Sequence, residues 1–171
     1  MFDRGSKLLE TDNLTKRFGG LTAVDSLSIS LAEGEIRGII GPNGSGKTTL
    51  MNLISGIYKV TSGAIYLDGK RIDHLKPNVR TASGIIRTFQ IPKVFRNMTV
   101  MENMLVPALS DSQGDRYKHH QEIVREAEEL LKFVQLEHMK DQLAKTLSGG
   151  QNMLLQIARG FMVDPLRLYL M

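Results

Sequence analysis

The stretch "GPNGSGKTT", at residues 41–49, constrains the fold of this chain more than any other feature of the sequence. It matches the pattern G-x-x-x-x-G-K-[ST], and the periodicity of the chain changes across it. The preceding "IRGII" (residues 36–40) is strand-like. Apolar residues then recur at helical spacing, at Leu50, Leu53, Ile54 and Ile57. The sequence therefore predicts a strand, a glycine-rich loop and a helix, in that order.

A loop of this kind is suited to binding phosphate groups. Its glycines let successive backbone N–H groups point inward at phosphate oxygens, and the helix adds its positive N-terminal end. Lys47 supplies a mobile positive charge for the β and γ phosphates, and Thr48 is placed to put its hydroxyl on Mg²⁺. A glycine turn that merely begins a helix is the alternative interpretation of the pattern.

Length and composition narrow the class of protein. A chain of 171 residues suits one domain, and 42% hydrophobic residues are enough for a sizeable core. The net charge of +4 is compatible with phosphate ligands, nucleic acid or an anionic membrane surface. The absence of cysteine excludes disulfides and thiolate metal sites. Because no apolar run reaches the roughly 18 residues of a membrane helix, and no signal peptide is recognisable, any action on a membrane is expected from outside the bilayer.

The first half of the chain reads mainly as a sheet. Residues 7–40 alternate apolar and polar positions between turn residues, which predicts several short strands. "GAIYLDGKRI" (63–72) predicts two more strands joined by a tight turn at Asp68-Gly69. "GIIRTFQ" (84–90) is typical of a further strand.

From about residue 99 the chain reads as helical and charged. An amphipathic helix is predicted within residues 117–136, with ion pairs Lys118/Glu122 and Glu128/Lys132. Its apolar stripe comprises Ile123, Ala127, Leu130, Leu131 and Val134.

The C-terminal part of the sequence predicts one more helix and one more strand. "LSGGQ" (147–151) precedes the helical pattern "QNMLLQIARGFM", with Ser148 as a candidate N-cap. "LRLYLM" (166–171) has the apolar pattern of a covered parallel strand.

Three motifs taken together resemble the ATP-binding-cassette (ABC) family: "GPNGSGKTT", "LSGGQ" and the glutamine of "RTFQ". The family also has an aromatic residue that stacks on adenine where Phe18 lies in "LTKRFGG". Stacking of a base on an aromatic ring is worth roughly 1–3 kcal/mol. A core phenylalanine is the alternative interpretation of Phe18.

The resemblance implies ATP and Mg²⁺ as cofactors and assigns the site residues. Gln90 matches the Q-loop glutamine that approaches Mg²⁺ and the attacking water, and Thr48 is the other metal-binding residue. The residues that bind the nucleotide of the same chain are Phe18 and the Walker A residues Gly41, Pro42, Asn43, Gly44, Ser45, Gly46, Lys47, Thr48 and Thr49. The signature residues face the nucleotide held by the opposite subunit, and they are Ser148, Gly149, Gly150 and Gln151.

Two longer stretches indicate a subfamily. "RFGGLTAV" and "GIIRTFQIPKVFRNMTVMENMLV" resemble the ATPase subunits of branched-chain amino acid importers, with urea and short-chain amide importers close behind. One position departs from that pattern, because Gly149 stands where those subunits often carry tyrosine. The resemblance implies a second ATPase subunit in a head-to-tail homodimer or heterodimer, integral membrane permease subunits and, through them, a substrate-binding protein. It implies a peripheral location at the cytoplasmic face of the inner membrane and no nucleic-acid partner, and the surface near Val94–Met104 is predicted to contact a permease.

The fold expected from the resemblance is α/β, a P-loop NTPase core with a mixed sheet, in which antiparallel N-terminal strands join a parallel core, and a helical insertion subdomain. The whole chain, 1–171, is expected to be one incomplete domain. Residues 1–90 and 162–171 would form the core and antiparallel strands, and residues 91–161 the Q-loop, helical subdomain and signature helix.

The end of the chain carries a further expectation. "LRLYLM" corresponds to the Walker B strand, which the family closes with Asp and then Glu, so those two carboxylates are expected to be absent and the C-terminal part of the core missing. Hydrolysis needs a carboxylate that positions water, whereas binding does not. An ATP-hydrolysing importer subunit is the first interpretation. A non-hydrolytic nucleotide-binding module or inactive truncated product is the second, and a soluble ABC ATPase outside transport is the third.

Overall fold

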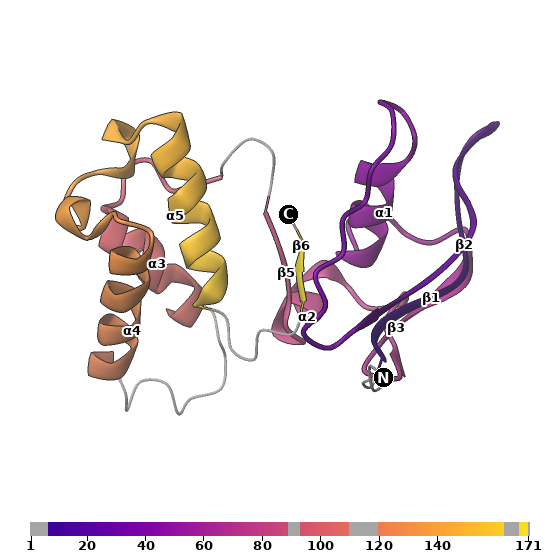
Figure 1. The fold of residues 1–171 in the computed structure, drawn as a ribbon, viewed down its shortest axis with the longest axis horizontal. Helices are drawn as coiled ribbons and strands as arrows, with labels where there is room; N and C mark the ends of the chain where they lie inside the picture. The colour runs from indigo at the N-terminus through magenta and orange to yellow at the C-terminus, as the bar shows by residue number, and fades with distance from the viewer. Residues whose placement is uncertain (1–6, 89–92, 110–119, 163–167, 171) are drawn as a thin grey trace. The chain divides into compact units, whose positions relative to one another are not determined.

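The computed structural model describes residues 7–88, 93–109, 120–162 and 168–170 (Figure 1). The chain forms two compact units, residues 1–81 and residues 82–171. The first unit contains an antiparallel sheet and the second contains a pair of parallel strands with helices, which confirms the predicted mixed α/β class. The predicted division into a core of residues 1–90 and 162–171 and a helical part of residues 91–161 stays a prediction.

The first unit is built on a four-stranded antiparallel sheet in the order β2-β1-β3-β4. Its strands are β1 (Lys7–Phe18), β2 (Leu21–Ala32), β3 (Ser62–Leu67) and β4 (Lys70–Arg71). Asp68 and Gly69 join β3 to β4 with φ of 49° and 71°, as a two-residue hairpin of this hand requires, so the predicted turn is confirmed. The several short strands predicted for residues 7–32 are instead two strands of 12 residues each, paired with register shifts.

The strand predicted at residues 36–40 is not formed. The structure has no regular secondary structure between Ala32 and the phosphate loop, and the side chains of Ile36 and Ile40 are 98% and 95% exposed. A strand is held by hydrogen bonds to a neighbouring strand, and none of the strands in the described ranges pairs with this segment. The apolar pattern alone therefore gave a wrong prediction here.

The first unit also includes α1 (Lys47–Ile54), which contacts β2, and nearly all of α2 (Pro77–Ala82). The apolar residues that form the core of this unit include Leu9, Leu14, Leu50, Leu53, Ile54, Ile65, Leu67 and Ile72. Arg80 on α2 is only 1% exposed, and its guanidinium donates to carbonyl oxygens at the end of α1. The core of the first unit thus includes one buried cation at the C-terminus of the helix that follows the phosphate loop.

In the second unit, β5 (Ile85–Arg87) pairs in parallel with β6 (Leu168–Leu170). Ile85 lies opposite Leu168, and Leu168 and Leu170 are buried. The strand predicted within residues 84–90 and the covered parallel strand predicted near the end of the chain are confirmed for the described residues.

Three helices form the rest of the second unit: α3 (Val100–Leu109), α4 (His120–Phe133) and α5 (Gly149–Phe161). Short 3-10 turns at Glu137–Met139 (η2) and Ala144–Thr146 (η3) connect α4 to α5 (Figure 1). The shared core consists of Val100, Met104, Ala127, Leu131, Leu136, Ala144, Leu147, Leu155, Ala158 and Met162. Val100 and Met104 are fully buried there, whereas Phe95 is exposed, and the predicted permease contact near Val94–Met104 stays a prediction.

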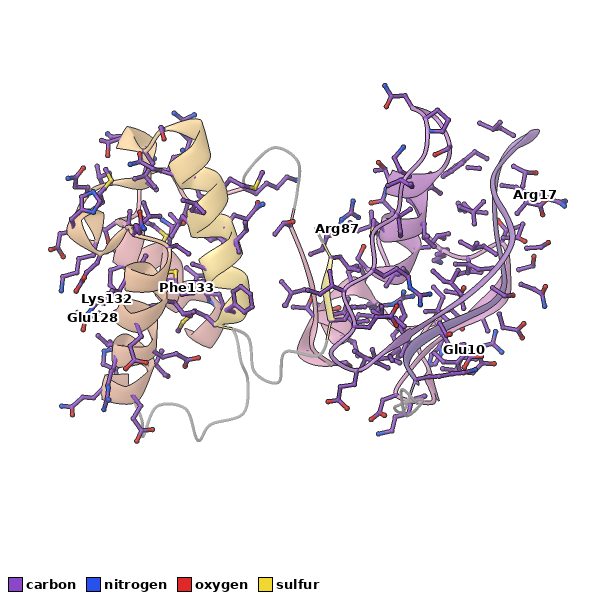
Figure 2. All side chains as sticks on the ribbon, viewed as in Figure 1. Glu10, Arg17, Arg87, Glu128, Lys132 and Phe133 are labelled. Carbon is purple, nitrogen blue, oxygen red and sulfur yellow. The ribbon has the colours of Figure 1, made fainter. Side chains whose placement is uncertain are left out.

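The apolar stripe predicted for the amphipathic helix is confirmed. Ala127 and Leu131 are fully buried, and the other stripe residues pack partly buried against them. The polar side was predicted less well, because Glu128 forms its ion pair with Lys140, at 2.8 Å, rather than with Lys132. Figure 2 shows Glu128 and Lys132 on α4, and Lys118 lies outside the described residues. Among the described helices, none is both long and apolar enough to cross a bilayer.

Candidate phosphate-binding site

The phosphate loop leads directly into α1. Gly46 is the N-cap residue, with a left-handed φ of 88°, and the Leu50 amide donates to its carbonyl at 2.8 Å. No side chain caps this helix. The amides of the first turn are therefore not used by a capping side chain, as a helix start that receives an anion requires.

Two glycines of the loop make close contacts, Gly46 with backbone and Gly41 with a side chain. A Cβ on Gly46 would lie 2.3 Å from the carbonyl oxygen of Ala23, so no other residue fits against β2 at that point. A Cβ on Gly41 would lie 2.8 Å from Ser45 Oγ, inside the curl of the loop. Gly44 differs, because it has a φ of 82° but a Cβ there would meet nothing within 4 Å. The loop is thus tightly curled and seated on the backbone of β2.

The Lys47 side chain folds back over this loop. Its ammonium donates to the carbonyls of Gly41 at 2.7 Å and Pro42 at 2.8 Å, and lies 3.4 Å from Ser45 Oγ. Among the ion pairs of the described residues, none neutralises Lys47. A lysine in this position holds the loop curled and brings an unbalanced positive charge to it.

The residues present fit a magnesium nucleotide. The Thr48 side chain is exposed in the first turn of α1. No cluster of three or more His, Asp or Glu residues that could hold a metal occurs among the residues that the structure describes. Mg²⁺ prefers a few protein oxygens together with substrate phosphates to a complete protein cage, so a single hydroxyl beside a phosphate loop is an adequate donor set.

Phe18 lies at the end of β1, where the β1–β2 hairpin turns. Its side chain is 41% exposed, so it is not a core phenylalanine. Its ring meets that of Tyr58 edge to face, with centroids 5.2 Å apart, and Lys16 Nζ lies 4.8 Å from its centroid. Sequence reasoning missed Tyr58 and Lys16, because a tyrosine after a helix and a lysine in a strand carry no local signal of a shared cluster.

The signature residues lie in the second unit, at the start of α5. The predicted N-cap is confirmed: Ser148 Oγ accepts from the Gln151 amide at 3.2 Å, and Gln151 Oε1 accepts from the Ser148 amide at 2.8 Å. This reciprocal arrangement is a capping box. Gly149 and Gly150 are exposed, and a Cβ on either would meet nothing within 4 Å. The fold of this chain alone therefore does not require glycine at these two positions.

The structure brings part of the predicted site together. Phe18 and residues 41–49 lie in one unit, where Phe18 ends β1 and Gly46 rests against Ala23 of β2. Ser148 to Gln151 form one cap in the other unit. Gln90 lies outside the described residues.

Comparison with known proteins agrees with this geometry. The sequence model of a family described as "ABC transporter" matches residues 24–170. The chain is 42% identical over 167 residues to the probable branched-chain amino acid transport ATP-binding protein LivG of Archaeoglobus fulgidus, covering 92% of this chain and 64% of that protein. It is 37% identical to the high-affinity branched-chain amino acid transport ATP-binding protein BraF of Pseudomonas aeruginosa, covering 92% of this chain and 66% of that protein.

A solved structure is similar to this chain in both fold and sequence. The ADP conformation of an ATP-binding cassette of an ABC transporter superimposes with a TM-score of 0.79 at 39% identity, covering 93% of this chain and 66% of that one. The chain thus spans slightly less than two thirds of the length of the curated relatives it matches.

Proposed function

The chain belongs to the ABC transporter family, and we propose that it is part of an ATPase subunit that binds and hydrolyses ATP with Mg²⁺ to energise a membrane importer. The observation that carries this proposal is the loop at residues 41–49. It is curled by Gly41 and Gly46, opens onto an uncapped helix start, and carries the unneutralised charge of Lys47.

Within this proposal the loop binds the phosphates and Phe18 binds the base. The Lys47 ammonium has three N–H donors, of which two make short bonds to loop carbonyls. The third points toward Ser45 Oγ at 3.4 Å, a long contact that a phosphate oxygen would readily replace. Thr48 contributes a hydroxyl to Mg²⁺, which balances charge on the phosphates, and Gln90 contributes to placing the metal and the water.

The solute is proposed to be a branched-chain amino acid or a related small solute. The relatives described above, from an archaeon and a bacterium, are named as branched-chain amino acid transport proteins. Gly149, in place of the tyrosine often found in that subfamily, is exposed at the start of α5, and a Cβ there would meet none of the described residues within 4 Å.

The proposed partners are a second ATPase subunit, permease subunits and, through them, a substrate-binding protein. Gly149 and Gly150 support the first partner, since their lack of side chains is not explained by contacts with the described residues. Close approach of another group to a helix start is a common reason for glycine. The head-to-tail arrangement would let Ser148 reach the γ-phosphate bound by the partner, at the cytoplasmic face of the membrane.

Calorimetric titration with MgATP tests the binding step. The parent chain is expected to bind MgATP, and Lys47→Ala is expected to lose most of the affinity, because the charge over the loop is removed. Lys70→Ala, which removes an exposed lysine from β4, is the matched control and is expected to bind like the parent. Equal affinity of Lys47→Ala and Lys70→Ala would contradict the assignment of the loop.

A further inference from the structure

The ring of Phe18 is held from one side by Lys16 and Tyr58, two residues to which the sequence motifs assign no role. Lys16 Nζ lies 4.8 Å from the centroid of Phe18 and 5.8 Å from that of Tyr58, and the two rings are 5.2 Å apart with an interplanar angle of 78°. These distances form a triangle in which, seen from Phe18, Lys16 and Tyr58 stand about 70° apart. Since Lys16 lies over one face of the ring, Tyr58 lies at its edge or on that same side.

The opposite face of Phe18 is therefore free of both residues, which agrees with the 41% exposure of its side chain. A cation over a ring face engages its negative π-density, and an edge-to-face pair sets the positive edge of one ring against the π-face of the other. Such contacts fix the plane of the ring while one face stays available for stacking.

Hydrogen bonds tie this cluster to the strand and to α1. Lys16 Nζ donates to the carbonyl of Lys59 at 2.9 Å, and the Thr61 amide donates to the carbonyl of Thr15 at 3.0 Å. The Tyr58 amide donates to the carbonyl of Asn52, within α1, at 3.0 Å. The helix that begins at the phosphate loop thus also anchors the tyrosine that supports Phe18.

The cluster and the phosphate loop meet β2 at positions two residues apart. Phe18 pairs with Leu21 across the hairpin, and Gly46 rests on Ala23 of the same strand. Two residues of a strand span about 7 Å, which ribose and the first phosphates of a nucleotide can bridge.

We propose that Tyr58 and Lys16 are positioning residues for nucleotide binding, which hold the Phe18 ring so that its free face stacks on the base. This inference rests on the proposed function, since it concerns how the same site distinguishes a nucleotide from bare phosphate. It assigns Tyr58 and Lys16 to the base and Lys47 to the phosphates.

The test compares the affinities of MgATP and magnesium tripolyphosphate, which has three phosphoryl groups and no base, by calorimetry on the full chain. Tyr58→Ala is expected to weaken MgATP about two- to tenfold and to leave tripolyphosphate unchanged, whereas Tyr58→Phe keeps the parent affinity for both. Lys16→Met is expected to act in the same selective way. Arg17→Met is its matched control, because Arg17 projects outward from the hairpin and joins none of the ring contacts of the described residues (Figure 2).

Two results would overturn the inference: an equal loss for both titrants in Tyr58→Ala and Lys16→Met, which indicates a merely structural role, or no loss of MgATP affinity in either. If Tyr58→Ala fails to fold by circular dichroism, Lys16→Met decides the question with the same two titrants. Lys47→Ala separates the two proposals. If Lys47→Ala binds both titrants like the parent, the proposed function fails. If Lys47→Ala loses affinity for both titrants while the Tyr58 and Lys16 variants bind MgATP like the parent, only this inference is contradicted.

Discussion

Replacing Arg80 by methionine should strongly destabilise the first unit. The Arg80 guanidinium is buried and donates to four carbonyl oxygens: Leu53 at 2.6 Å, Ile54 at 2.8 Å, Asp73 at 2.9 Å and Leu75 at 3.2 Å. Burial lowers the pKa of the Arg80 guanidinium, and Asp73 acts in the opposite direction. An arginine nonetheless stays charged at any ordinary pH. Because two of these carbonyls end α1, the cation also interacts favourably with the negative end of that helix.

The size of the effect follows from which carbonyls lose their donor. The Leu53 carbonyl keeps the Gly56 amide at 3.1 Å, and the Leu75 bond is long. The carbonyls of Ile54 and Asp73 lose the donor that Arg80 provides, at about 1–3 kcal/mol for each buried group. Removing a buried charge recovers part of this. We expect a net loss of about 3 kcal/mol, a large share of the roughly 5–15 kcal/mol that stabilises a typical domain.

Urea unfolding followed by circular dichroism measures this loss. Arg80→Met keeps most of the apolar stem and removes every donor, so a lower midpoint with an unchanged slope is expected. The matched control is Arg71→Met, since Arg71 is a neighbouring arginine whose side chain is 56% exposed and pairs with Asp73. Its midpoint should move by only a small fraction of the Arg80 shift. Equal shifts for the two variants would refute the role given to the buried hydrogen bonds.

Two other changes have clear expected outcomes. Gly46→Ala should abolish MgATP binding and destabilise the chain, because its Cβ would lie 2.3 Å from the Ala23 carbonyl. Gly44→Ala, which shares the positive φ but has open space, should lose only about 1–2 kcal/mol of unfolding free energy, and similar losses for both would contradict the close contact. Ser148→Ala should lose about 1 kcal/mol of unfolding free energy with the helix cap, and Ser148→Asp should retain most of it. A destabilised Ser148→Asp beside a stable Ser148→Ala would contradict the capping role.

The features predicted well from the sequence are those encoded by a few neighbouring residues. The turn at Asp68-Gly69 needs only two residues that accept positive φ, and both have it. The cap at Ser148 joins residues three apart, and the buried stripe containing Ala127 and Leu131 follows from one helical period. Local chemistry decides each of these, so the sequence pattern was sufficient.

The features predicted wrongly or missed depend on partners far along the chain. Residues 36–40 have a strand-like pattern, but a strand forms only where another pairs with it. Glu128 pairs with Lys140 because the chain turns back after α4, which no helical spacing reveals. Arg80 caps a helix 26 residues earlier, and Tyr58, between α1 and β3, meets Phe18 at the end of β1, so only the folded chain shows their roles.

The central claim is that the loop at residues 41–49 binds the phosphates of ATP, and the backbone amide resonances of this 19.1 kDa chain test it most directly. In ¹H–¹⁵N spectra recorded during MgATP titration, the amides from Gly44 to Thr48 should show the largest shifts, and those of Lys47→Ala should stay nearly unchanged. Magnesium tripolyphosphate should reproduce the shifts in the loop but not those near Phe18. Saturable shifts elsewhere, with the amides from Gly44 to Thr48 unmoved, would contradict the account.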